Sequence, residues 1–229
     1  MSSVAAEPIR VVTAGRTDAG VHGLAQVIHF DTHAQRPVTA WVRATNSLLP
    51  APIRVLWAHE VSNAFHARYS ARSRSYIYLL YNHPLRPGFL YRRVGWYHRP
   101  LNESRMQQAA ALLVGEHDFS AFRAAQCQAK SPVRNVLGAS VERRGEFIVL
   151  RFQANAFLHH MVRNIVGSLV YVGAGKQPVE WIGALLEGRD RTHAAPTFAP
   201  DGLYLAGIEY DPSWGLPAFP PHAYAYPLA

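Results

Sequence analysis

The clearest pattern along the chain is the alternation of side chains over two segments, 74–82 and 146–154. In the first, both alternating sets are apolar or aromatic, which predicts a strand buried inside a sheet. In the second, every other residue from Ile148 to Ala154 is apolar, so one face is expected to pack inward. Similar patterns predict strands at 9–14, 21–30, 53–61, 133–142 and 203–209.

The predicted helices are marked by apolar residues three to four positions apart. This spacing is most regular over 157–172. Proline or asparagine at the start and glycine or proline at the end bound three further helices, which we place at 37–49, 102–114 and 178–186. Strands and helices in this order predict an α+β fold with a largely antiparallel sheet and helices on one face.

Composition narrows the class of protein. With 229 residues, 49% hydrophobic and 17% charged, the chain can bury a sizeable core. No apolar run approaches the roughly 20 residues that cross a bilayer, and the first ten residues lack the apolar centre of a signal peptide. The single cysteine, Cys127, excludes an internal disulfide framework and a CxxC zinc site. We therefore expect a cytoplasmic protein.

The positive charge of the chain suggests its partner. The net charge is +8, and only Lys130 and Lys176 are lysines among 23 basic residues. Arginine binds phosphate oxygens with two parallel donors and stacks on bases, so this excess favours a nucleic-acid partner. A GC-rich genome would explain the ratio of arginine to lysine but not the excess of positive charge.

Twelve histidines raise the question of a metal site. His59 and Glu60 precede His66 at a spacing that does not fit one helix face. His159 and His160 are adjacent and, in a helix, would point to different faces. We expect structural or RNA-facing histidines rather than a metal site. Phosphate-binding GxxxxGK[ST] and nucleophile GxSxG motifs are absent from the sequence.

Two stretches carry candidate chemistry with an ordinary alternative. In "GRTDAG", residues 15–20, Asp18 would lie at the rim of a sheet and could face a groove, but Thr17 and Asp18 could equally cap a turn. Arg163 lies at the edge of the apolar stripe of its helix, where it could reach a neighbouring site or simply be exposed. Taken alone, each stretch favours the ordinary alternative.

A third stretch mixes basic and aromatic side chains. Segment 65–78 interleaves arginines with phenylalanine and tyrosines, a mixture that suits phosphate contacts and base stacking. An ordinary strand with a solvated basic loop explains it equally well. The arginines are Arg68, Arg72 and Arg74, and the aromatic residues are Phe65, Tyr69, Tyr76 and Tyr78.

Read together, four motifs resemble the tRNA pseudouridine synthase A family in order and spacing. They are "AGRTDAGVHGLAQVIHFD", "FHARYSARSRSYIYLLYN", "EHDFSAFRAAQCQAKSPVRNV" and "NAFLHHMVRNIVGSL". The resemblance continues through "DRTHAAPTFAPDGLYLAGIEY" and covers nearly the whole chain. Several linked motifs in one order are far more specific than any one alone.

The resemblance implies a pseudouridine synthase fold. Two ferredoxin-like halves, which we expect at 1–92 and 93–229, would share a mostly antiparallel sheet with helices on one face and an RNA-binding cleft on the other. It implies isomerisation of uridine to pseudouridine at positions 38, 39 and 40 of the anticodon stem-loop of tRNA. It also implies a homodimer and neither a cofactor nor a metal.

The family's functional residues fall on particular positions of this chain. The resemblance makes Asp18 the catalytic aspartate, Tyr76 the tyrosine that stacks on the base, and Arg163 the partner of the aspartate. Arg16 matches the arginine of the RTD motif, and Leu203 matches the apolar residue that lines the pocket. Further RNA contacts are expected from Arg68, Arg72, Arg74 and His22.

The expected chemistry centres on an ionised Asp18, a state that the positive charge of Arg163 favours. The target uridine must leave the helical stack, and Arg16 could hold it out. Asp18 would attack the sugar or remove a proton from it, giving either an ester or a glycal intermediate. The phenol of Tyr76 could help to remove the proton on C5.

One departure from the family concerns the start of the chain. Related chains carry a strand with a Tyr-Asp-Gly…Gly-Trp-Gln pattern and a helix before the GRTDAG loop, whereas here the loop follows Met1 closely. We expect either a start codon assigned too late or a shortened form. The alternative function is therefore a catalytically impaired, truncated tRNA-binding protein.

Overall fold

The computed structural model describes residues 1–217, which form two compact units interleaved along the sequence. The larger unit comprises 17–25 and 73–207. The smaller unit comprises 1–16, 26–72 and the described residues from 208 onward. The expected halves, 1–92 and 93–229, stay a prediction. Near the end of the chain, residues 212–214 form a single 3₁₀ turn, and 218–229 lie outside the described residues.

A seven-stranded sheet is built mainly from the larger unit, although β4 (Ala71–Asn82) begins in the smaller unit and β9 (Leu203–Tyr210) ends in it. Its strand order is β2-β9-β4-β8-β7-β6, and β5 pairs with β4. The β4–β8, β7–β8 and β6–β7 pairs are antiparallel, while β2–β9 and β4–β5 are parallel. The bounds are β2 (His22–Gly23), β4 (Ala71–Asn82), β5 (Gly95–Tyr97), β6 (Gly115–Asp118), β7 (Val133–Arg144), β8 (Phe147–Ala154) and β9 (Leu203–Tyr210).

Strand β4 lies inside this sheet, as its two apolar faces predict. It pairs with β8 on one side, from Arg74 opposite Ala154 to Tyr81 opposite Phe147, and with β9 on the other. Tyr78 is fully buried in the main core and Leu79 lies in a second cluster on the opposite face. A strand covered on both faces is a rigid support for side chains at its ends.

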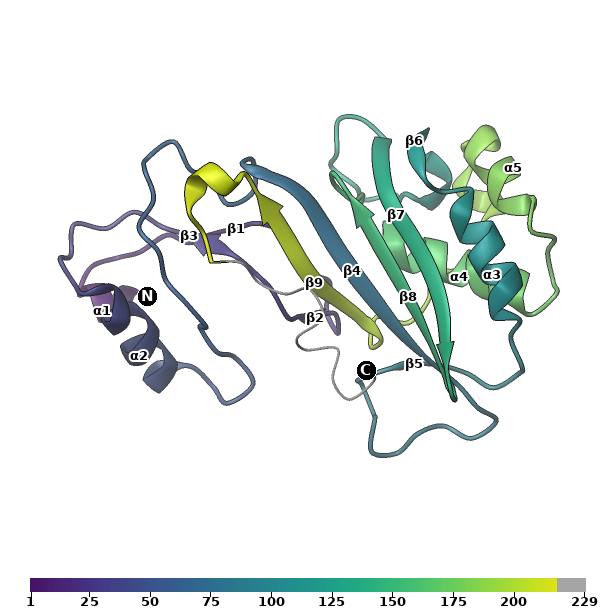
Figure 1. Cartoon of the computed structure of the whole chain (residues 1–229), viewed down its shortest axis with the longest axis horizontal. Coiled ribbons are helices and arrows are strands. Elements are labelled where there is room, and N and C mark those ends of the chain that lie inside the picture. Colours follow the sequence, from purple (N-terminus) through teal and green to yellow (C-terminus); the bar gives the residue numbers. More distant parts are fainter. Residues whose placement is uncertain (218–229) are drawn as a thin grey trace. The chain divides into compact units, whose positions relative to one another are not determined.

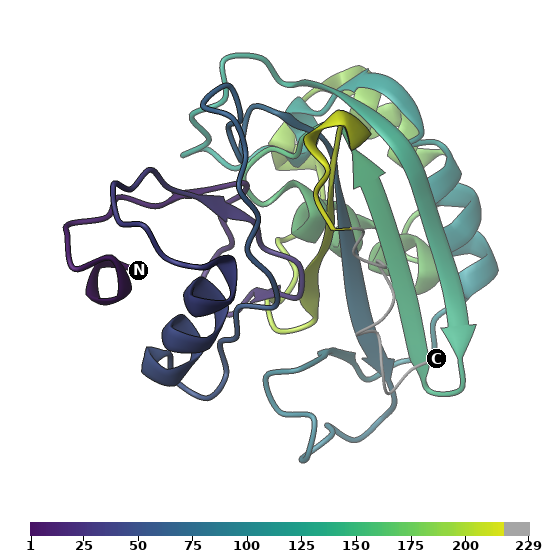
Figure 2. The ribbon, with the colours of Figure 1, turned by 60° about the vertical axis from the view of Figure 1, so that its left-hand side comes forward.

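Three helices cover one face of the sheet: α3 (Glu103–Ala111), α4 (Met161–Gly173) and α5 (Trp181–Gly188). They lie on one side of β7 and β8 in both views (Figures 1 and 2). Eleven residues of α4 are buried, and Arg163 and Tyr171 are its two exceptions. The mixed α+β class predicted from the sequence, with helices on one face, is confirmed.

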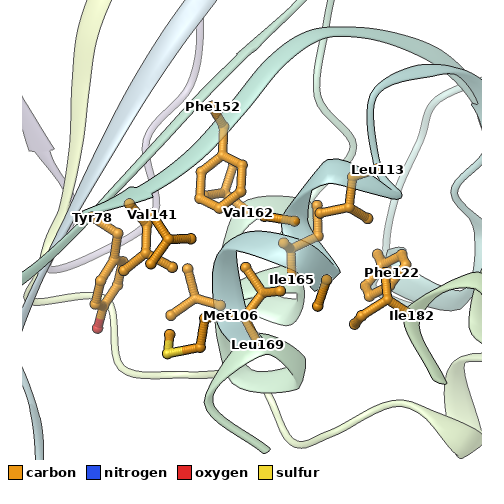
Figure 3. Close-up of a cluster of buried hydrophobic side chains, with 14 of the residues drawn as sticks. Tyr78, Met106, Leu113, Phe122, Val141, Phe152, Val162, Ile165, Leu169 and Ile182 are labelled. Atoms are coloured by element: carbon orange, nitrogen blue, oxygen red, sulfur yellow. The ribbon is translucent and has the colours of Figure 1, made fainter. Parts of the chain in front are cut away.

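The main core lies between the sheet and these helices. Tyr78 from β4 packs with Met106 from α3 and Leu169 from α4, and Phe122 with Ile182 closes the far end (Figure 3). Each fully buried large apolar side chain contributes about 1.5–3 kcal/mol. This packing fixes α4, which carries Arg163, against the sheet that carries Tyr76.

Two helices begin later than the sequence pattern predicts. The helix expected from residue 157 begins at Met161, because His160 adopts a left-handed φ of 60°. The helix expected from Pro178 begins at Trp181. At α3 the prediction is confirmed, since Asn102 Oδ1 accepts from the backbone N–H of Arg105 at 2.9 Å.

The smaller unit holds α1 (Ser2–Ala5), α2 (Val38–Leu48) and a two-stranded sheet of β1 (Val12–Thr13) and β3 (Ile28–His29). The strand predicted at 53–61 is wrong. Asn46 takes the place of a partner strand, because its side-chain amide donates to the carbonyl of Val55 and accepts from the N–H of Val55. Within the described part of the chain, no helix has the length and apolar character to cross a membrane.

Candidate active site

The GRTDAG motif forms a turn in which the backbone of Asp18, not its side chain, makes the closing hydrogen bond. The N–H of Val21 donates to the carbonyl of Asp18 at 3.0 Å. Gly20 has a φ of +85°, which favours glycine at this position of a turn. A Cβ there would lie 3.0 Å from Cγ of Pro200. The carboxylate of Asp18 is therefore left for another partner.

Arg163 is that partner. Its Nη1 donates to Oδ2 of Asp18 at 2.9 Å, and its Nε donates to the carbonyl of Phe198 at 2.9 Å. The Arg163 side chain is 13% exposed and that of Asp18 is 24% exposed, so water screens the pair only in part. Because Arg163 lies in the first turn of α4, the helix dipole also favours the negative charge of Asp18.

Two histidines complete the surroundings of the carboxylate. Nε2 of His159 lies 3.3 Å from Oδ1 of Asp18, and Nε2 of His160 lies 3.2 Å from Oδ2. The expectation that these rings point to different faces of a helix is wrong. Both residues precede α4, and the left-handed backbone of His160 brings the ring centroids to 3.9 Å.

The pKa of His160 is lowered. Burial is the largest cause, and the positive charges of His159, Arg163 and Arg191 act in the same direction, whereas Asp18 opposes them. A lowered pKa keeps the His160 imidazole neutral at pH 7. The permanent positive charge beside Asp18 therefore comes from Arg163.

The same cluster offers the donor set of a metal site. One ligand atom each from Asp18, His159 and His160 lies within 4.8 Å of the others. Two imidazoles and a carboxylate suit transition metals, so excluding histidine pairs on spacing alone missed this group. The guanidinium of Arg163 already occupies Oδ2 of Asp18, and its charge repels a cation there. The arrangement suits an arginine-paired carboxylate better than a metal centre.

Tyr76 faces the same region from β4. It is half-buried, pairs with Phe152 across the strands and packs edge-on against Phe157, with ring centroids 5.0 Å apart. Burial raises the pKa of Tyr76 to about 12, the negative charge of Asp18 adds to the rise, and Arg74 opposes it. The phenol is therefore neutral at physiological pH, next to a carboxylate.

A buried polar group that the sequence pattern did not reveal holds the loop behind Arg163. The Asn164 side chain is fully buried, and its Nδ2 donates to the carbonyl of Phe122 at 2.8 Å. Its Oδ1 accepts from Thr197 at 2.7 Å and from Arg191 at 3.1 Å. These bonds fix the segment whose Phe198 carbonyl orients Arg163. Asn164 lies within the apolar pattern of α4, and a polar residue there was the available signal.

Three other predicted site residues lie in the larger unit. Leu203 is buried in the main core at the start of β9. The Nη1 of Arg74 donates to the carbonyl of Asn155 at 2.9 Å. His22 is half-buried, and its Nε2 lies within hydrogen-bonding distance of two backbone carbonyls.

The remaining predicted residues belong to the smaller unit. Arg16 and Arg68 are exposed, and Arg68 lies over the ring of Tyr69. Arg72 is exposed and forms an ion pair with Asp211. The structure thus brings Asp18, Arg163 and Tyr76 into one unit. The predicted roles of Arg16, Arg68 and Arg72 stay predictions.

Comparison with known proteins decides the family. Residues 109–211 match the model of a tRNA pseudouridine synthase family. The chain is 58% identical over 219 residues to tRNA pseudouridine synthase A of Nitrosomonas eutropha, covering 96% of this chain and 79% of the relative. The chain belongs to the tRNA pseudouridine synthase A family. The relative from Dechloromonas aromatica is 58% identical over 217 residues, covering 95% of this chain and 83% of its own length.

Membership of the tRNA pseudouridine synthase A family makes the chain an isomerase. The family match over 109–211 includes Arg163 and Leu203, and the longer alignments cover nearly all of the chain. An isomerase of this family needs a group that reacts with the nucleoside, and the arginine-paired carboxylate of the larger unit is the candidate.

Proposed function

We propose that this chain isomerises uridine to pseudouridine in tRNA, at positions 38, 39 and 40 of the anticodon stem-loop, with Asp18 as the catalytic residue. The observation that carries the proposal is the half-buried Asp18 carboxylate, paired with Arg163 and flanked by His159 and His160. The names of the curated relatives supply the substrate class.

The reaction is an internal rearrangement of one nucleoside. The bond between C1′ of the ribose and N1 of the base breaks, the base turns, and C1′ bonds to C5. The proton on C5 is lost to solvent and N1 gains one, so that the product is an isomer of the substrate. Asp18 could attack C1′ to form an ester or remove a proton from C2′ to form a glycal. Both routes use an ionised carboxylate.

The surroundings of Asp18 support this role. The fork of Arg163 is fixed at one end by the Phe198 carbonyl, so Asp18 is held in one orientation before the substrate arrives. Asp18 retains 24% exposure of its side chain, which leaves room for a sugar to approach. A carboxylate that is ionised, oriented and accessible meets the needs of either route.

Tyr76 is proposed to stack on the target base. Its ring is held at a fixed angle by Phe157, so it offers a flat surface beside Asp18. The raised pKa of Tyr76 works against a phenolate that would remove the C5 proton at neutral pH. A stacking role therefore fits Tyr76 better than a role as a general base. Leu203 would line the pocket that holds the target base.

The further RNA contacts, the two halves of the fold and the oligomeric state belong to the same proposal. Arg16 would hold the everted nucleotide out of the helix, and Arg68, Arg72, Arg74 and His22 would contact the RNA. Two ferredoxin-like halves, an RNA-binding cleft and a homodimer are expected from the family resemblance. The net charge of +8 supports a polyanionic partner.

Tritium release tests the proposal. Isomerisation frees the hydrogen on C5, so wild-type protein should release tritium from a tRNA transcript labelled at uridine C5. Asp18→Ala and Asp18→Asn should lose this activity, by at least about 10³-fold, while tRNA affinity stays within a few-fold. Glu116→Gln, at an exposed carboxylate on β6, is the matched control and should retain full activity. Tritium release by Asp18→Ala would end the assignment.

The alternative, an impaired tRNA-binding protein, gives a different result in the same assay. Wild-type protein would bind the transcript and release no tritium at any concentration. The family membership of the chain and the presence of Asp18, Tyr76 and Arg163 in one unit favour the isomerase.

A further inference from the structure

The segment between β4 and β5 exposes large aromatic and basic side chains. We define residues 85–93 as the aromatic-basic loop. Phe89 is 90% exposed, Leu85 72% and Tyr91 63%, which are high values for large apolar residues. Arg86, Arg92 and Arg93 are exposed beside them, and the sequence from His83 to Leu101 has no acidic residue.

The loop is held at its base, not loosely attached. Leu90 packs against the second core cluster, between the outward Phe89 and Tyr91. The indole N–H of Trp96 donates to the carbonyl of His83 at 2.8 Å. In Figures 1 and 2 the loop extends beyond the end of the β7–β8 hairpin. The exposed rings are thus presented by an anchored segment.

One contact ties the loop to the segment that carries Asp18, and a second ties it to β9. Nε2 of His22 lies 2.9 Å from the carbonyl of Arg92, and the hydroxyl of Tyr204 donates to the carbonyl of Arg93. The rings of His22 and Tyr204 stack at 4.6 Å. His22 directly follows Val21, which closes the Asp18 turn. The structure therefore gives His22 an anchoring role at the base of the loop.

Two arginines of the loop lie over aromatic rings in or next to it. The guanidinium of Arg92 lies 5.4 Å from the ring centre of Tyr91, and that of Arg86 lies 5.5 Å from Trp96. A pocket of about 340 Å³ opens beside the loop, and His83, His98, Arg99 and Arg143 are among its lining residues. Two acids balance part of this charge, since Glu146 pairs with His83 and Glu103 with Arg143.

We propose that the aromatic-basic loop is an RNA-contact surface, on which Phe89 and Tyr91 stack with unpaired bases while Arg86 and Arg93 bind phosphates. The inference rests on the proposed function, and it names a contact of the tRNA outside the Asp18 site. Exposed rings interleaved with arginines, in a stretch of sequence that has no acidic residue, complement a polyanion with accessible bases.

Two double variants separate stacking from phosphate binding. Phe89→Ala with Tyr91→Ala removes the rings, and Arg86→Gln with Arg93→Gln removes charge; Arg92 is left intact because its φ is 58°. The controls are Leu112→Ala at the end of α3 and Arg43→Gln within α2, both exposed residues outside the loop. The probe is an unmodified tRNA transcript with uridine at 38, 39 and 40.

The aromatic variant should raise the dissociation constant about tenfold, the order expected for one lost stacked base. The arginine variant should reduce the slope of log affinity against log salt by about 1.5, as expected for two lost phosphate contacts. Both controls should bind as wild type does. The urea midpoint should be unchanged in all four, because the replaced side chains are exposed.

Several results would overturn the inference. If both double variants bind the transcript within twofold of wild type, the loop does not contact RNA. If the aromatic variant instead changes the sedimentation coefficient and leaves affinity unaltered, a second copy of the chain covers the loop. Failure of the proposed function is distinct, because wild-type protein would then bind the transcript through this loop and release no tritium.

Discussion

The start of α4 and the start of β4 each carry an arginine paired with an aspartate, but they differ in how that arginine is held. Arg163 is 13% exposed and has both ends of its guanidinium fixed, by Asp18 and by the Phe198 carbonyl. Arg72 is 63% exposed and meets Asp211 at the surface of the smaller unit. Arg163 is therefore part of the packed interior of its unit, whereas Arg72 lies on the surface of its own.

The difference follows from the elements that carry the two residues. Arg163 belongs to a helix that is otherwise almost wholly buried, so its long side chain runs along apolar surface to reach a polar site. Arg72 lies near the start of β4, where the strand is still exposed. Partial burial strengthens an ion pair and makes its loss costly, whereas water screens an exposed pair.

The largest effect is expected from Arg163→Met, which keeps the apolar stem and removes the guanidinium. Asp18 would lose its permanent counter-charge and the bond that orients it. We expect pseudouridine formation to fall at least about 100-fold and the free energy of unfolding to fall by about 1–3 kcal/mol, a value discounted for the partial exposure of Asp18. Single-turnover tritium release and urea denaturation measure the two quantities.

Arg163→Lys serves as the control for charge alone. Lysine restores a cation but cannot donate from a planar fork to Asp18 and Phe198 together. It should recover part of the stability and less of the rate. If Arg163→Met were as active as wild type, Arg163 would not be needed to orient Asp18. The contrast with the exposed Arg72 would then be wrong.

Much of this arrangement could be predicted from residues alone. Two apolar faces placed β4 inside the sheet, and the position of Arg163 at the edge of its stripe allowed it to reach a site. The pairing of Arg163 with Asp18 came from the family resemblance, because nothing local links residues 145 positions apart. Contacts between residues far apart in the sequence can be assigned only once the fold is known.

Other features depended on backbone geometry or on competing side chains. Periodicity does not reveal the positive φ of His160, yet that angle directs both histidines to Asp18. The segment 53–61 has the alternation of a strand, but at Val55 both backbone groups bond to the side chain of Asn46 instead of to a partner strand. Apolar patterning reports burial, and it does not report which group satisfies the backbone.

An effect of intermediate size on the free energy of unfolding is expected from Tyr76→Phe at alkaline pH. Its pKa is raised from 10 to about 12, mainly by burial. A raised pKa means that its contribution to stability is complete below pH 10 and is lost as the pH rises towards 12. Tyr76→Phe should therefore make the free energy of unfolding fall less steeply in that window, by up to about 1.4 kcal/mol per pH unit.

Urea denaturation at pH 9, 10 and 11 measures this slope, and tyrosinate absorbance follows the ionisation directly. Burial also raises the pKa of Tyr78, which steepens the slope in both proteins and cancels in their difference. Equal slopes in wild type and Tyr76→Phe would mean that water reaches the phenol, and that Tyr76 resembles the exposed region more than the packed one.

The smallest effect is expected from Arg72→Gln. Because Arg72 and Asp211 are both open to water, the urea midpoint should not change measurably. If Arg72 contacts a phosphate, as proposed, tRNA affinity should fall a few-fold and the salt slope by about one. Asp211→Asn separates the two roles, since it removes the ion pair and leaves Arg72 for RNA. Destabilisation by Arg72→Gln on the scale of Arg163→Met would show that an exposed arginine can hold the fold together, and that partial burial does not distinguish the two regions.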